Sequence, residues 1–215
     1  IEVPRHQLVD VAGKQALLSW RFDRDGNTRI PFLSAMSMLG AKDNVPMSYP
    51  ELADELARHG SNTAHDLKQL YRRVAFNILI SNVDDHLRNH GFLWGGVKGW
   101  TLSPAYDLNP VPTDVKQRVL STRISMDDAT CDIGLLESVS DYFGLSLSDG
   151  REIIREVAEA TSQWREVAHA CRASNSEIER MESAFEHQDL ANALKATTAV
   201  PVSAGAKTKR RGPRL

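Results

Sequence analysis

The chain is poor in cysteine and has no long apolar run. Its two cysteines, Cys131 and Cys171, are forty positions apart and match no spacing typical of zinc sites or disulfides. We therefore expect both to be buried free thiols in a reducing cytoplasm. No apolar stretch approaches the length that crosses a bilayer, and no signal-peptide pattern opens the chain. These absences predict a cytoplasmic protein with no membrane partner.

Glycine-rich phosphate loops are also missing. Neither G-x-G-x-x-G nor G-x-x-x-x-G-K-[ST] occurs, and Gly13, Gly95 and Gly96 are better explained as hairpin turns. Of the seven histidines, only His86 and His90 lie near each other and near carboxylates. A zinc site there is conceivable, but the local spacing supplies no third ligand of the usual type.

The composition is that of an ordinary globular protein, with 41% hydrophobic and 25% charged residues. The length suffices for one substantial core, or for one lobe plus a tail. The charge is uneven, because residues 207–214 carry five positive charges and no acid. Such a terminus is more often a solvated tail than a docking element. Contact with DNA phosphates is the functional alternative.

Two polar segments carry the chemistry. Residues 82–89 read Asn-x-Asp-Asp-His-x-x-Asn, and residues 103–108 read Ser-Pro-Ala-Tyr-Asp-Leu. An Asp followed five positions later by an Asn, with another Asp beyond a short apolar segment, is typical of a phosphoryl-transfer site. One carboxylate accepts a hydroxyl proton, while an amide oxygen and the other carboxylate hold Mg²⁺. The alternative is structural, with an Asx-turn and helix cap followed by an ordinary strand end.

The residues between the two segments favour the catalytic interpretation. Two apolar runs, 92–94 and 100–102, flank the glycine-containing stretch 95–99, which is the composition of a β-hairpin. A hairpin brings its two ends together. Asn89 and Asp107 could therefore hold one metal ion although they are distant in sequence.

These motifs resemble the C-terminal lobe of the HipA family, bacterial serine/threonine kinases that are the toxins of toxin–antitoxin pairs. The resemblance covers residues 1–145 well, and residues 17–24 resemble the family's hinge strand, whose backbone receives adenine. It implies ATP and Mg²⁺ as cofactors, a protein substrate and a helix-turn-helix antitoxin as partner. Contact with DNA would be indirect, through that antitoxin.

Carried over to this chain, the resemblance assigns roles in catalysis and in phosphate or metal binding. Asp84 would be the base that orients the substrate hydroxyl, and His86 would sit beside it near the phosphates. Asn89 and Asp107 would hold Mg²⁺. Asp85 stands where the family often has a small residue, and it joins the nucleotide-binding candidates. Two adjacent carboxylates leave open which is the base, although the five-residue offset to Asn89 favours Asp84.

The resemblance also assigns the residues that contact the nucleoside. Trp20, Arg21 and Phe22 would form the hinge that faces adenine, with Asp23 near the ribose. Tyr106 would line the nucleotide. Trp20 occupies a position that is often acidic in the family, so only its backbone role carries over.

The expected fold is α+β and mostly α: a protein-kinase-like C-terminal lobe with a short N-terminal hinge hairpin and a catalytic-loop hairpin. We expect hinge strands at 1–24, a HipA-like lobe at 25–194 and a basic disordered tail at 195–215. Residues 111–133 lack clean periodicity and are either a peptide-facing loop or a connector. Strands are expected at 6–10 and 15–20, and helices at 33–39, 50–58, from a cap at 61–63 to near 80, 147–171 and 178–185.

The expected reaction is transfer of the ATP γ-phosphate to a serine or threonine hydroxyl of a protein. A kinase also needs a phosphate-cradling loop and a lysine, which these residues do not supply. We therefore expect either the C-lobe of a longer kinase, inactive alone, or a natural split in which another polypeptide supplies the N-lobe. The alternatives are a non-catalytic antitoxin- or DNA-docking module, and a metal-dependent phosphohydrolase that uses the Asp-Asp-His cluster on bound water.

Overall fold

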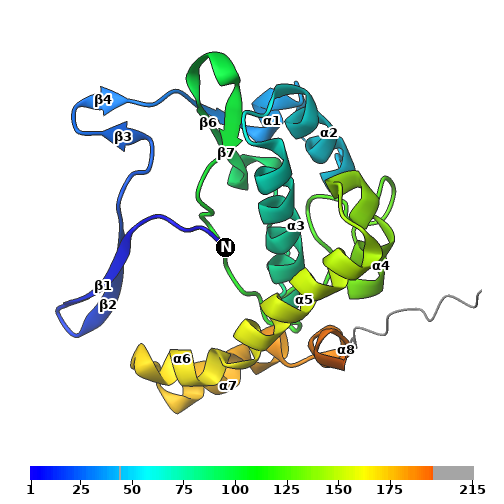
Figure 1. Cartoon of the computed structure of the whole chain (residues 1–215). Helices are drawn as coiled ribbons and strands as arrows, with labels where there is room; N and C mark the ends of the chain where they lie inside the picture. The colour runs from blue at the N-terminus through cyan, green and yellow to red at the C-terminus, as the bar shows by residue number, and fades with distance from the viewer. Residues whose placement is uncertain (44, 196–215) are drawn as a thin grey trace, which may run out of the picture.

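A long helix, α3 (Thr63–Leu79), forms the centre of the computed structural model, with α2 (Tyr49–His59) and α5 (Leu147–Ser162) packed beside it (Figure 1). The structure describes residues 1–43 and 45–195. The tail predicted at 195–215 lies outside the described residues except for its first position. Within them the chain is mixed and mostly helical, which confirms the coarse fold class. No described helix is both long and apolar enough to cross a membrane.

The N-terminal residues form two small antiparallel hairpins. β1 (His6–Val11) pairs with β2 (Lys14–Ser19), and β3 (Arg24–Asp25) pairs with β4 (Thr28–Arg29). The strands predicted at 6–10 and 15–20 are confirmed as β1 and β2. Figure 1 shows the β1–β2 hairpin standing apart from the helical body. Most side chains of both strands are exposed.

The hairpin predicted between the apolar runs 92–94 and 100–102 is confirmed and belongs to a three-stranded sheet. β6 (Gly91–Trp94) pairs with β7 (Trp100–Leu102) and, on its other edge, with β5 (Phe32–Ser34). Residues 33 and 34, where the predicted helix 33–39 was expected to begin, belong instead to strand β5. The helix α1 is therefore short, Ala35–Met38, and begins where the Ser34 side chain accepts a hydrogen bond from the Ser37 N–H.

The central helices follow their sequence signals closely. Ser48 and Glu51 form a capping box at the start of α2, and the helix ends at Gly60. The apolar positions of α3 that recur at helical spacing are buried, including Leu70, Val74 and Ile78 at 0% exposure. The side-chain cap expected at the start of α3 is not formed: Asn62 is the N-cap residue, but its side chain makes no capping hydrogen bond.

The C-terminal part differs most from expectation. The single helix predicted at 147–171 is broken at Gln163 into α5 and α6 (Trp164–Ala170). The hydroxyl of Thr161 bonds back to the Val157 carbonyl, a contact that bends helices. Beyond the break, the Trp164 ring stacks on Phe185 with centroids 4.5 Å apart. Burial of that ring outweighs the continuity of the helix.

Three further helices complete this part: α4 (Ile133–Ser138), α7 (Asn175–Phe185) and α8 (Gln188–Lys195). A capping box at Ser174 confirms the predicted start of α7. Cys131 is buried as expected, but Cys171 is exposed because α6 ends there at the surface, so the prediction of two buried thiols is half wrong.

Candidate active site

The loop that follows α3 turns its two adjacent carboxylates in opposite directions. The Asp84 side chain is 69% exposed, whereas the Asp85 side chain is 2% exposed. The Oδ1 of Asp85 lies 2.8 Å from the Nε2 of His90 inside the core. The orientation of Asp85 therefore disagrees with the predicted nucleotide contact. Of the two carboxylates, only Asp84 is open to contact from outside the core.

Asn89 lies at the end of a short 3₁₀ turn, Leu87–Asn89, and is bonded to the same loop. Its Nδ2 donates to the Asp84 carbonyl at 3.2 Å. That carbonyl also receives the His86 N–H at 3.0 Å. Within the described residues no donor reaches the Asn89 Oδ1, so this oxygen can accept or coordinate.

Two hydrogen bonds place the second motif beside this loop. The Tyr106 hydroxyl donates to the Arg88 carbonyl at 2.8 Å, and the Val111 N–H donates to the Ser81 carbonyl at 3.2 Å. The segment from 106 to 111 therefore runs alongside the segment from 81 to 88. Asp107 lies within the first of these stretches, so the structure brings together the two segments that the sequence singled out.

The backbone at Asp107 is in the left-handed region, with φ at 57°. Asp tolerates this conformation better than most residues. The Asn109 Nδ2 donates to the Asp107 Oδ1 at 2.6 Å, and the other carboxylate oxygen has no donor among the described residues. Upstream, the buried Arg73 guanidinium donates to the Ser103 carbonyl and so fixes the start of the motif.

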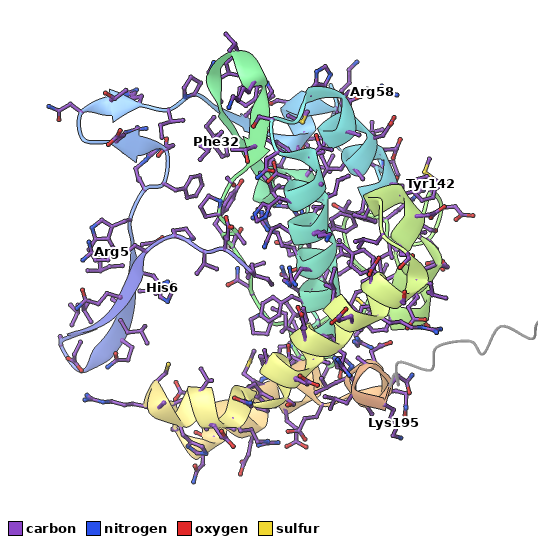
Figure 2. All side chains as sticks on the ribbon, viewed as in Figure 1. Arg5, His6, Phe32, Arg58, Tyr142 and Lys195 are labelled. Atoms are coloured by element: carbon purple, nitrogen blue, oxygen red, sulfur yellow. The ribbon has the colours of Figure 1, made fainter. Side chains whose placement is uncertain are left out.

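The predicted hinge residues and Tyr106 line one pocket of about 390 Å³. The rings of Phe22 and Tyr106 stack with centroids 5.7 Å apart, and the Phe32 ring tilts against both. Figure 2 shows Phe32 on the sheet, and Arg5 on the N-terminal hairpin. Burial raises the pKa of Tyr106 to about 12, so its hydroxyl stays a donor at neutral pH. The pocket is lined by Pro4, Ser19, Trp20, Arg21, Phe22, Asp23, Phe32, Arg88 and Tyr106.

Asp23 is already engaged at the edge of this pocket. Arg21 binds it through two nitrogens, at 2.8 and 2.6 Å, and Arg24 binds it at 2.6 Å. The Arg21 guanidinium is the main reason that the pKa of Asp23 falls to about 2. A ribose hydroxyl would meet a carboxylate that remains ionised and is held in place by two arginines.

His86 does not line the aromatic pocket. It faces a second cavity of about 330 Å³, whose wall also includes Lys42, Met47 and Thr122. Arg88 lines both cavities, so they adjoin at this residue. A larger groove of about 470 Å³, along α5 to α7, is apolar and contains none of the predicted site residues.

Sequence reasoning missed two basic residues of the site. Arg88 joins the two cavities, and its position inside the polar motif was the available signal. The Lys116 ammonium lies 3.9 Å from the Asp84 carboxylate. It comes from the aperiodic stretch 111–133, where spacing gave no signal. Lys116 is thus a cation beside Asp84, whereas the Arg88 guanidinium forms an ion pair with Asp43.

The two predicted metal ligands are chemically suited to Mg²⁺ rather than to a transition metal. Asn89 and Asp107 offer one amide oxygen and one carboxylate oxygen, which are hard ligands, and Mg²⁺ is often held by one or two such groups plus phosphates. Among residues 1–43 and 45–195, no three side chains of His, Cys, Asp or Glu converge as a metal site. The zinc site considered at His86 and His90 is therefore not formed by the described residues.

Comparisons with known proteins identify the family and the fold of the chain. Residues 1–165 match the family described as HipA-like C-terminal domain. A Haemophilus influenzae protein named "Putative kinase" is 26% identical over an alignment of length 164 that covers 66% of this chain and 48% of that protein. The HipA structure from Shewanella oneidensis MR-1, solved with HipB and operator DNA, superposes with a TM-score of 0.67 at 19% identity, covering 91% of this chain and 51% of that one. The chain thus spans about half the length of these relatives.

Proposed function

The chain belongs to the HipA-like C-terminal domain family, and we propose that it forms the C-terminal lobe of a protein kinase. The reaction would transfer the γ-phosphate of ATP to a serine or threonine hydroxyl of a protein substrate. One observation carries the proposal: the pocket formed by residues 20–23 and Tyr106 is tied to the Asp84 loop by the Tyr106–Arg88 hydrogen bond. A nucleotide held in that pocket would extend its phosphates toward Asp84.

The aromatic residues of the pocket suit a purine base. Phe22, Phe32 and Tyr106 supply flat apolar faces, and offset stacking of aromatic rings contributes about 1 kcal/mol beyond the burial of area. The backbone of the hinge strand would offer hydrogen bonds to the adenine edge. Asp23 would accept from the ribose while Arg21 and Arg24 hold it in place.

Asp84 would orient the acceptor hydroxyl and take its proton. The hydroxyl oxygen then forms the new bond to the γ-phosphorus, and the bond from phosphorus to the departing ADP breaks. Asn89 and Asp107 would hold Mg²⁺, which when bound neutralises charge on the phosphates. Lys116 would add positive charge from the protein beside Asp84.

The partners of the whole protein are proposals of the same kind. The Shewanella HipA structure contains HipB and operator DNA. We propose an antitoxin partner for the present protein as well, and contact with DNA only through that partner. The missing phosphate loop and lysine would come from another part of the kinase or from another polypeptide.

The test uses the protein expressed from its complete gene, with Asp84→Asn and Asp107→Asn as variants. Asn tolerates the left-handed backbone at 107, so this change removes charge without adding backbone strain. We expect Asp84→Asn to bind Mg·ATP normally and to lower γ-phosphate transfer by roughly 10²–10⁴-fold. Asp107→Asn should weaken Mg²⁺-dependent ATP binding by about tenfold or more, as measured by titration calorimetry.

Asp54→Asn, a change of an exposed carboxylate on α2, is the control and should leave both properties unchanged. Equal Mg²⁺-dependent binding in wild type and Asp107→Asn would contradict the metal role. ATP binding without transfer by the wild-type protein would favour a non-catalytic docking module instead.

A further inference from the structure

The loop carries a second pair of side chains, Asp85 and His90, that the proposed mechanism does not use. The His90 Nε2 lies 2.8 Å from the Asp85 Oδ1, and the two side chains are 3% and 2% exposed. They are five positions apart, as are Asp84 and Asn89. Each member of the buried pair therefore directly follows a member of the site-facing pair.

The buried pair is part of a chain of contacts that starts and ends in the same loop. The Tyr49 hydroxyl lies 3.4 Å from the His90 Nε2, and the two rings meet edge to face at 5.4 Å. Asn77 donates to the Tyr49 hydroxyl, and Asn82 donates to the Asn77 side chain at 3.0 Å. Because Tyr49 belongs to α2 and Asn77 to α3, both ends of the loop are held on the helical core.

Backbone contacts hold the same two residues from the other side. The Thr122 hydroxyl donates to the Asp85 carbonyl at 2.8 Å, and the Ala35 N–H donates to the His90 carbonyl at 2.8 Å. Asp85 and His90 are thus fixed through both side chain and backbone. The Asp84 side chain is exposed, and the backbone fixed at residue 85 limits the positions that the neighbouring Asp84 carboxylate can take.

We propose that Asp85 and His90 are positioning residues for phosphoryl transfer, a role that rests on the proposed function. Their contact sets the separation between the Asp84 carboxylate and the Asn89 amide. Neither residue lines the aromatic pocket, so they would act only through their neighbours. The Asp85 Oδ2 and the His90 Nδ1 are buried with no partner among the described residues, and a buried polar atom without a hydrogen bond costs free energy. A hydrogen bond has a preferred distance and angle, which apolar packing lacks, so it can fix the orientation of the loop residues.

The experiment compares Asp85→Leu/His90→Leu with Asp85→Asn in the protein expressed from its complete gene. The double variant replaces the polar pair by apolar packing, so it avoids an unpaired buried charge and should fold. Asp85→Asn keeps an oxygen that can accept from His90. The control is Ile154→Ala, which removes buried volume from α5, away from the loop.

We expect the double variant to lower kcat on the order of tenfold to a hundredfold, because small misplacements of catalytic groups have effects of this size. Its KM for ATP should stay near the wild-type value, since the aromatic pocket is untouched. Asp85→Asn should keep kcat within roughly threefold of wild type, because the hydrogen bond to His90 is retained. Ile154→Ala should lower Tm without changing kcat at temperatures where it is folded.

A double variant with wild-type kcat would overturn the positioning role. The role would also be overturned if Ile154→Ala lowered kcat as much as the double variant does at an equal loss of Tm. A low kcat in Asp85→Asn would also overturn it, because the hydrogen bond would then not be the feature that acts. A wild-type protein without any transfer would overturn the proposed function itself and this role with it. The two failures are distinguished by the wild-type measurement.

Discussion

Tyr106 contributes to the candidate site through two separate parts of one side chain. Its ring stacks on Phe22, and its hydroxyl ties the second motif to the Arg88 carbonyl. We expect Tyr106→Ala to weaken ATP binding by roughly fivefold to tenfold, because about 1 kcal/mol of stacking is lost. Tyr106→Phe should bind ATP almost as wild type but unfold with about 1 kcal/mol less free energy, since only a hydrogen bond is lost.

Titration calorimetry and urea unfolding measure these two effects. Tyr142→Ala is the matched control, because Tyr142 is 51% exposed and lies far from the pocket (Figure 2). Equal losses of ATP affinity in Tyr106→Phe and Tyr106→Ala would show that the ring does not contact the base.

The two cysteines should differ sharply in reactivity. Burial raises the pKa of the Cys131 thiol to about 12, whereas Cys171 is exposed at the end of α6. Only the thiolate reacts with iodoacetamide, so at pH 8 we expect Cys171 to be alkylated first and Cys131 to remain unmodified. Peptide mass spectrometry measures both, and unfolding in urea should make the two rates similar. Comparable labelling in the folded protein would contradict the burial of Cys131.

For single residues, the sequence could identify the candidate side chains but not whether each one faces solvent or the core. The five-residue offset that links Asp84 to Asn89 also links Asp85 to His90, so spacing alone fits both pairs. The structure separates them through burial, because Asp84 faces solvent and Asp85 faces the core. Directions of this kind depend on Tyr49 and on other residues distant in the chain, which no local pattern reveals.

Among the elements, α3 both fills the central core and leads directly into the loop that carries Asp84. Ile78 is fully buried one turn before the loop, so truncation should leave a cavity. We expect Ile78→Ala to reduce the free energy of unfolding by about 2–5 kcal/mol in urea titrations followed by circular dichroism. Lys68→Ala, on the exposed side of the same helix, should change it by less than about 0.5 kcal/mol. A loss below about 1 kcal/mol at Ile78 would show that this part of α3 is not tightly packed.

Helix starts and the central hairpin were predictable because their signals are local. Ser48 and Ser174 begin helices as capping boxes, and the glycines at 95–99 separate β6 from β7. The break at Gln163 was not predictable, since it depends on the stacking of Trp164 against a ring far along the chain. The strand β5 was missed for a similar reason, because its pairing partner β6 lies about sixty positions away.

The whole molecule joins a packed helical body to a nearly free hairpin. The β1–β2 strands expose Leu8, Val11 and Leu17 by 43%, 57% and 64%. A two-stranded hairpin is marginally stable in water, so this one gains little from its own packing. Its last residue, Ser19, and the following Trp20 nevertheless line the aromatic pocket. Their position there could be anticipated only from the family resemblance, because hydrophobic periodicity gives no long-range contact.

At the C-terminal end, His187 connects α7 and α8 to the end of α3. Its Nε2 lies 3.1 Å from the Leu79 carbonyl, and the Arg118 and Asp189 side chains face it. Burial is the main reason that the pKa of His187 is lowered, with the Arg118 charge acting in the same direction and Asp189 opposing them. The folded protein therefore binds a proton here less readily than the unfolded chain does.

It follows that the stability contributed by neutral His187 is complete above about pH 6.5, the ordinary pKa of histidine, and is lost as the pH falls below it. We expect the free energy of unfolding to be smaller at pH 5 than at pH 7.5, and His187→Gln to reduce that difference while keeping a donor for the Leu79 carbonyl. Urea unfolding of both proteins at the two pH values measures the effect, and the comparison cancels the other histidines. An identical pH dependence in the variant would mean that His187 is protonated as easily in the folded protein as in the unfolded chain, so that the junction of α3, α7 and α8 is open to water.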